Sequence, residues 1–288
     1  MLIEPAEFYA NPETMGTNPY QVDEHEPPEV VLKKAIKEFR NFRNMLVENG
    51  VIVTTARGHV GCPDHLFPNW VSTHENNGMV LYPMLNENRR QERTPDLIAA
   101  LSNIYDVVED LTDWENQGLM LESTGSIVMD RINKVGYAGL SARTSRGAAE
   151  EWGRRMGYEM VLFETRGHTG QPIYHTDLVI SIGTEVAAIA AECITDEYRD
   201  MVLSRLSKTH DIIEYSAEQQ QSFCGNSLEV LGEDDKRMLV MSDKAFGALT
   251  EQQINKLSGY FDRILHAPLP TIEAYGGGSA RCLMLELF

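Results

Sequence analysis

The sequence has few cysteines and no closely spaced pair of them, which excludes two classes of small domain. Four occur among 288 residues: Cys62, Cys193, Cys224 and Cys282. This spacing argues against a disulfide framework and against a zinc ribbon. We therefore expect a reducing compartment, the cytoplasm, and expect the first three cysteines to be structural. His59, His65 and His74 match no H-E-x-x-H pattern, so no metal site is predicted.

Long apolar runs are also missing. The most apolar stretch, residues 178–194, is interrupted by Thr184, Glu185 and Glu192, whereas a membrane-spanning helix needs about 20 apolar residues in succession. The first residues include Glu4 and no apolar run, so no secretory signal is expected. The sequence therefore predicts no membrane partner.

Positive charge is the third shortage. The chain has 25 Lys and Arg against 43 Asp and Glu, a formal net charge of −18 at pH 7. This surplus of acid disfavours a nucleic acid as partner and is compatible with a cationic small molecule. No phosphate-binding glycine loop is present, because Gly276–Gly278 precede a predicted strand rather than a helix. We expect no cofactor.

Helical and strand-like segments alternate along the whole chain. Helices are predicted for residues 28–50, 94–111, 146–156 and 195–206, and for a segment that begins with the capping box at Thr250 and Gln253. Strand-like runs are residues 51–56, LFPNWVST, SIVMDR, EMVLFET, TDLVISIG, SLEVLG, RMLVMS and RCLMLELF. The charged run 89–93 is predicted to be a solvated turn. Length alone allows roughly two domains, but no linker interrupts the pattern, so we predict a single domain over residues 1–288.

Five segments share one plan, in which a polar residue opens a strand-like run that is followed by a second strand and a helix. The polar residues are Asp64, Glu122, His175, Asn226 and Cys282, and neighbours are 51 to 58 residues apart. A repeat of about fifty residues predicts an α/β fold in which five ββα-type units form a ring. The opening residue of each unit is then expected to lie near the common axis, where polar side chains indicate a site rather than a core.

Cys282 is the candidate nucleophile of this site. It follows the triglycine 276–278 and Arg281, a context that a buried apolar cysteine does not need. His175 is the expected general base and acid for a thiol, and Glu122 is available to orient it or to bind substrate.

The same site is predicted to be rich in carboxylates. Asp177 follows His175 by two residues, so on a strand both side chains would point to the same face. Together with Asp64 and Glu122, it indicates a cationic ligand that donates hydrogen bonds. A guanidinium group fits, because its planar fork of N–H donors suits paired carboxylates.

In this order and spacing the motifs resemble the guanidine-modifying (pentein) superfamily of arginine deiminases, dimethylarginine dimethylaminohydrolases and amidinotransferases. The resemblance is closest to the arginine deiminase-related branch of citrulline utilisation hydrolases. The motifs are PDHLFPNW, LESTGS, GLSART, the H-x-D at 175–177 and GGGSARC. The resemblance implies a five-bladed α/β propeller with pseudo-fivefold symmetry and hydrolysis of arginine to citrulline and ammonia.

The resemblance also implies roles for individual residues. Cys282 would attack the guanidinium carbon to form a covalent thiouronium adduct. His175 would protonate the departing ammonia and then activate water. Substrate contacts would come from Glu122, Asp177, Asp64, Asn69 and Arg143, of which Arg143 is similar to the family arginine that pairs with the α-carboxylate.

One departure from the family pattern leaves the reaction open. Arginine deiminases have a further carboxylate after the Phe of the first repeat, whereas here Phe67 is followed by Pro68 and Asn69. An asparagine there is similar to arginine dihydrolases, which give ornithine and two ammonias, and an amidinotransferase is a further alternative. An arginine- or citrulline-binding protein on the same fold is the non-enzymatic alternative, which the complete Cys, His and Glu set disfavours. The sequence leaves a homo-oligomer open.

Overall fold

The computed structural model describes all residues, 1–288, and its strands form five small sheets. Four of the sheets have three strands and one has two. The three-stranded sheets consist of β3 (Val71–His74), β4 (Gly78–Leu81) and β5 (Asp106–Asp110); β6 (Val128–Asp130), β7 (Val135–Leu140) and β8 (Glu159–Glu164); β9 (Ile180–Ile182), β10 (Val186–Ile189) and β11 (Asp211–Glu214); and β12 (Leu228–Leu231), β13 (Arg237–Ser242) and β14 (Arg263–Ala267).

All four three-stranded sheets repeat one topology. The first strand pairs antiparallel with the second, and the second pairs parallel with the third. The parallel pair requires a crossover, which helices provide. These helices are α2 (Glu87–Arg90) and α3 (Pro95–Leu101), α5 (Arg146–Met156), α6 (Asp196–Leu206), and α8 (Asp243–Ala248) and α9 (Glu251–Leu257). Four of the five predicted ββα units are therefore ββαβ units.

The fifth sheet joins the two ends of the chain. β1 (Leu2–Glu4) pairs parallel with β2 (Thr55–Arg57), and α1 (Pro28–Glu48) connects them. On the other side of β1, the Leu285 amide donates a 3.0 Å hydrogen bond to the Met1 carbonyl. The C-terminal run was predicted to be a strand, but Arg281–Leu283 form a 3₁₀ turn and only the residues after it run beside β1. Cys282 therefore lies in a turn.

The remaining three helices are short and lie close to the predicted site residues along the chain. They are α4 (Ser123–Ser126), α7 (Ala217–Gln221) and α10 (Pro270–Gly276). In addition, 3₁₀ turns span Thr112–Gln117, Thr176–Leu178, Ala191–Cys193 and Glu233–Asp235. α4 begins directly after Glu122, α7 precedes Asn226, and α10 precedes Cys282.

Most predicted helices are confirmed. In α1 the residues buried are Val31, Ala35, Phe39, Phe42 and Leu46, at the three- and four-residue spacing of an amphipathic helix. α5 covers the predicted residues, and α9 begins with the predicted capping box. The helix predicted over 94–111 is wrong beyond Leu101, because the β-branched run that follows pairs with β4 as β5.

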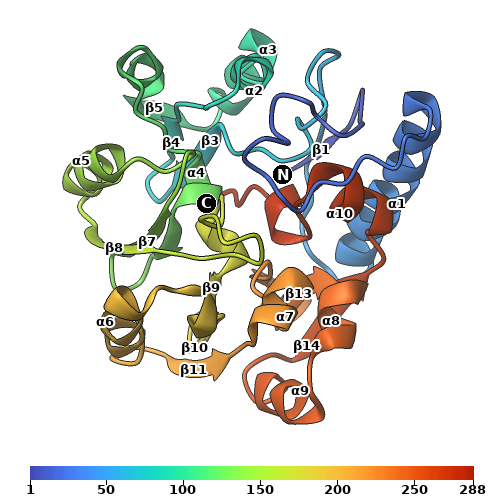
Figure 1. Cartoon of the computed structure of the whole chain (residues 1–288). Coiled ribbons are helices and arrows are strands. Elements are labelled where there is room, and N and C mark those ends of the chain that lie inside the picture. The colour runs from blue at the N-terminus through green and yellow to red at the C-terminus, as the bar shows by residue number, and fades with distance from the viewer.

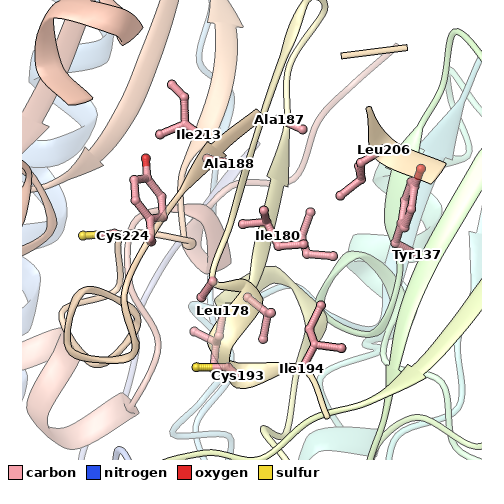
Figure 2. Packing of buried hydrophobic residues seen from close by; sticks show 14 of the residues in the cluster. Tyr137, Leu178, Ile180, Ala187, Ala188, Cys193, Ile194, Leu206, Ile213 and Cys224 are labelled. Carbon is pink, nitrogen blue, oxygen red and sulfur yellow. The ribbon is translucent and has the colours of Figure 1, made fainter. Parts of the chain in front are cut away.

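The sheets surround the middle of the molecule, where the C-terminus lies (Figure 1). Helices α1, α3, α5, α6 and α9 lie on the outside, and the blue α1 packs beside the red α10. The largest apolar cluster has 28 buried residues, and Figure 2 shows how Ile180, Ala187 and Ala188 of one sheet lie near Leu206 of α6. No helix is long and apolar enough to cross a membrane. The crossover helices thus cover the outside and leave the strand-opening turns to face the middle.

Candidate active site

A small cavity lies among the turns that precede the first strand of the units. Five of the seven predicted site residues line it: Asp64, Asn69, Arg143, His175 and Cys282. The other lining residues are Asn18, Phe67, Arg89, Tyr174, Gly276 and Gly278. The cavity has only about 10 Å³ of free space, and every lining residue is buried. This is close to the ~10–15 Å³ that a single water molecule needs, so the site is closed in this structure and must open to admit a ligand.

The Cys282 thiol lies against a carboxylate. Its Sγ is 3.3 Å from Asp177 Oδ2, and both side chains are buried. Burial, and then the charge of Asp177, raise the pKa of the thiol well above its usual value. Burial also raises the pKa of Asp177. Before substrate binds, Cys282 is therefore a neutral thiol that donates its proton toward Asp177.

His175 and Glu122 form the second pair. His175 Nε2 lies 2.8 Å from Glu122 Oε2, with both side chains almost fully buried. Burial raises the pKa of the Glu122 carboxyl, but the charges of Arg143, His175 and Arg89 outweigh it and lower the pKa to about 2. Glu122 is therefore anionic at neutral pH and accepts the hydrogen bond from the imidazole. It lies behind His175 rather than in the cavity wall.

A glycine in α4 makes room for the imidazole. A Cβ atom built on Gly125 would lie 2.5 Å from His175 Nδ1, which is too close for any residue with a side chain at position 125. The backbone of α4 therefore forms one face of the histidine site, and Glu122, at the N-terminus of the same turn, reaches the other ring nitrogen.

The geometric reason for predicting His175 and Asp177 on one face was wrong, although both reach the site. The residues lie in a turn, since His175 has extended backbone angles and Thr176–Leu178 form a 3₁₀ turn. Thr176 between them points elsewhere, donating to the Ser126 carbonyl at 2.6 Å. His175 consequently lines the cavity, while Asp177 lies behind Cys282 and contacts it through Sγ.

Arg143 lies in the cavity wall beside Glu122. Its Nη1 is 3.6 Å from Glu122 Oε2, and its Nη2 donates to Thr17 Oγ1 at 3.0 Å. The guanidinium carbon lies 4.7 Å from the ring centroid of Tyr174, within the range of a cation–π interaction. The arginine is held from three sides, with its guanidinium in the wall of the cavity.

The charged run 89–93 is not the solvated turn that was predicted. Arg89 and Glu92 are buried, with Arg89 Nε 2.8 Å from Glu92 Oε1. Arg89 also donates to the Phe67 carbonyl at 2.6 Å and to Asn69 Oδ1 at 3.3 Å. Arg89 and Tyr174 are thus cavity residues that the sequence reasoning missed. The run has no apolar periodicity, so only the i,i+3 spacing of Arg89 and Glu92 hinted at a paired face.

Two carboxylate oxygens at the cavity have no hydrogen-bond partner. Asp64 Oδ2 accepts from Asn11 at 2.8 Å and from Thr14 at 3.1 Å, but its Oδ1 is unpaired. Asp177 Oδ1 is unpaired in the same way. Because unsatisfied buried oxygens are costly, these two indicate a ligand that brings N–H donors.

A segment near the N-terminus closes the cavity. Asn18 lines the wall and donates to the Gly276 carbonyl at 3.1 Å. Gln21 donates to the Tyr275 carbonyl at 3.0 Å, and Thr14 and Thr17 accept from Arg143. These polar contacts, together with the packing of Tyr20 against Tyr174 and Phe223, hold this covering segment, residues 11–21, over the cavity.

No group of three or more His, Cys, Asp and Glu side chains is arranged to hold a metal ion. His65 Nδ1 accepts from the His59 amide at 2.9 Å, and His74 pairs with Ser72 in a separate buried network. The three histidines noted in the sequence do not converge.

One family model matches the sequence, and several solved structures share the fold. A sequence model of eukaryotic N,N-dimethylarginine dimethylhydrolase matches residues 4–288. A search of curated proteins found no match. Among solved structures, the N-terminal domain of ArgZ, a cyanobacterial arginine dihydrolase, bound to substrate is 18% identical, with a TM-score of 0.76 over 98% of this chain and 95% of that one.

Two further structures share the fold. AgrE in a binary complex with L-arginine is 18% identical, with a TM-score of 0.77 over 98% of this chain and 39% of that one. A dimethylarginine dimethylaminohydrolase adduct with 4-chloro-2-hydroxymethylpyridine is 17% identical, with a TM-score of 0.64 over 88% of this chain and 91% of that one. The chain spans 40% of the longer ArgZ chain.

The contact between the thiol and Asp177 predicts how Cys282 reacts with an alkylating agent. In Asp177→Asn the like charge is gone, so iodoacetamide should modify Cys282 at neutral pH roughly tenfold faster or more. The rate should be followed by mass spectrometry across pH, with Cys282→Ala as background and Asp130→Asn, a buried aspartate elsewhere, as the matched control. An unchanged pH profile in Asp177→Asn would show that the carboxylate does not hold the thiol neutral.

Proposed function

The chain belongs to the N,N-dimethylarginine dimethylhydrolase family, within the guanidine-modifying (pentein) superfamily of hydrolases, and on this premise we propose that it hydrolyses the guanidino group of arginine to citrulline and ammonia. The reaction would proceed through a covalent adduct on Cys282. The observation that carries the proposal is the pair of unpartnered carboxylate oxygens, on Asp64 and Asp177, beside a buried thiol. A guanidinium ion supplies the N–H donors that both oxygens lack.

Substrate binding would itself activate the nucleophile. The positive charge of a guanidinium beside Asp177 offsets the like-charge penalty that keeps Cys282 protonated. The Sγ proton would pass to His175, and the thiolate would attack the guanidinium carbon, forming a C–S bond. The imidazolium would then return the proton to the departing nitrogen as the C–N bond breaks, releasing ammonia and leaving the thiouronium adduct.

The second half of the reaction would use water. His175 would take a proton from a water molecule, whose oxygen attacks the adduct carbon, and the C–S bond would break to give citrulline and the free thiol. The proton left on the imidazolium would then pass to the released ammonia, which leaves as ammonium. Glu122, held anionic by its cationic neighbours, would stabilise the imidazolium that forms in both halves. Among the side chains, only Cys282 and His175 would change their charge during the reaction.

The other end of the substrate would meet two arginines. Arg89 and Arg143 both line the cavity, and each is buried against polar partners. Guanidinium groups bind carboxylates with charge-assisted, often bidentate hydrogen bonds. The α-carboxylate of a free amino acid would therefore lie toward these two side chains. Because the cavity is closed by residues 11–21, this segment would move aside to admit substrate.

Dihydrolysis to ornithine and two ammonias is the second candidate. Asn69 lines the cavity and is neutral, whereas a carboxylate at this position, as in arginine deiminases, would make the site more anionic. Its Oδ1 is 3.3 Å from Arg89 Nη1. The structural likeness to ArgZ, which is an arginine dihydrolase, favours the same reaction.

We also propose that the five sheets are the blades of one five-bladed α/β propeller and that residues 1–288 are a single domain. The four identical topologies and the pairing of Leu285 with Met1 across the chain ends support it. The axis would then run through the cavity.

Product analysis tests the reaction. Wild-type protein incubated with L-arginine should release citrulline and one ammonia, and Cys282→Ala should lose at least about 10³-fold in kcat, the scale for loss of a covalent nucleophile. Release of ornithine and two ammonias from arginine would indicate dihydrolysis. Release of dimethylamine from dimethylarginine would identify dimethylarginine as the substrate instead. An enzymatic role would be contradicted if wild-type protein turned over no guanidine and Cys282→Ala still bound arginine as the wild type does.

The role of Arg143 predicts a difference between arginine and agmatine, which lacks the carboxylate. Arg143→Ala should lower kcat/KM for arginine by roughly 10²- to 10³-fold, because it removes a buried charge partner, and should leave agmatine much less affected. Arg146→Ala, at an exposed arginine of α5, is the matched control. Equal wild-type activity on the two substrates would overturn the assignment.

A further inference from the structure

Asn226 contacts the candidate nucleophile at two atoms, the sulfur and the backbone amide. Its Nδ2 lies 3.2 Å from Cys282 Sγ and 3.2 Å from the Asp177 carbonyl oxygen. Its Oδ1 accepts from the Arg281 amide at 3.1 Å and from the Cys282 amide at 3.3 Å. The side chain is completely buried, so these contacts are not shared with solvent.

The local sequence explains how the asparagine reaches this place. A Cβ on Gly225 would lie 2.5 Å from the Leu178 carbonyl oxygen, so only glycine lets this loop approach the turn that carries Asp177. Phe223 takes a positive φ of 64°, and Gln220 donates to the same Leu178 carbonyl at 3.3 Å. The loop is therefore clamped onto the 176–178 turn, and Asn226 lies between that turn and Cys282.

We propose that Asn226 is a positioning residue for Cys282, fixing the backbone of the nucleophile through its amide oxygen and stabilising the sulfur anion through its amide N–H. The proposal deepens the proposed function, since it concerns the thiol to which that function assigns the attack. It is also independent of turnover, because it describes the thiol itself.

Two polar side chains contact the sulfur, and they act on it in opposite directions. Asp177 can only accept the thiol proton, so it favours the neutral thiol. The Asn226 amide can only donate at Nδ2, and a hydrogen bond to an ionised acceptor is about twice as strong as one to a neutral acceptor. Asn226 thus favours the thiolate. Because an amide does not titrate, its effect is the same throughout the working pH range.

Other charged groups face the sulfur but are placed differently. His175, Asp64, Arg89 and Arg143 line the cavity with Cys282, and Arg281 adjoins it in the chain. The side chains that hydrogen-bond to Sγ, however, are Asn226 and Asp177, and the Ser279 backbone is a further donor to the thiol. Replacing the amide therefore changes a direct contact of the sulfur while these charges stay in place.

The test is the pH profile of Cys282 alkylation in two variants. Asn226→Asp keeps an oxygen for the two backbone amides and replaces the donor with an anionic oxygen, so alkylation by iodoacetamide at neutral pH should fall roughly tenfold or more and the profile should move to higher pH. Asn226→Ser, which is smaller and uncharged, should move it in the same direction by less. Asn133→Asp, in a surface turn, is the matched control and should not move it.

The outcomes separate this proposal from a structural role and from the proposed function. Both variants should melt cooperatively, which shows that they fold. If both fold and the pH profile of Cys282 alkylation is the same as in wild type, the proposal is overturned. If Asn226→Asp does not fold, Asn226→Ser alone decides, by a shifted or an unshifted profile. If wild-type protein hydrolyses no guanidine, the proposed function fails, whereas the alkylation profile still measures the contact of Asn226 with the sulfur.

Discussion

The site depends on placing three carboxylates and a thiol in a space from which water is excluded. Buried charges are stable only when they are paired. Glu122 is paired with His175 and with two arginines, whereas Asp177 forms no salt bridge and its Oδ2 contacts the Cys282 thiol, with the charges of His175 and Arg281 acting on it from further away. This imbalance leaves one side of the site anionic, and a guanidinium ion is the ligand that we propose for it.

The fold supplies these partners through one repeated position. The turn before the first strand of a unit lies toward the middle of the molecule, and Glu122, His175 and Asn226 lie in such turns, while Cys282 lies in the 3₁₀ turn near the C-terminus. The chain ends meet at β1, so that the turn carrying Cys282 is tied to the first residues. Cys282, the candidate nucleophile, also belongs to an apolar cluster that includes side chains of α1.

Much of this arrangement could be predicted from the sequence because it follows from spacing. The interval of 51 to 58 residues between polar openings predicted the repeat, and helical periodicity predicted α1 and α5. Arg89 escaped prediction because a buried ion pair leaves no apolar pattern, and Tyr174 because an aromatic beside a strand is usually core. The placement of Asp177 behind Cys282 follows from a 3₁₀ turn whose presence no periodicity indicates. Contacts between turns of different units depend on three-dimensional packing, which local patterns do not encode.

The central claim is that a guanidinium in this carboxylate-lined cavity forms a covalent bond to Cys282. Rapid acid quench of the protein mixed with arginine, followed by peptide mass spectrometry, tests it most directly. The account predicts that the peptide containing Cys282 gains the mass of arginine less ammonia during turnover and loses it when substrate is exhausted. Turnover with no such adduct, or an adduct on another residue, would contradict it.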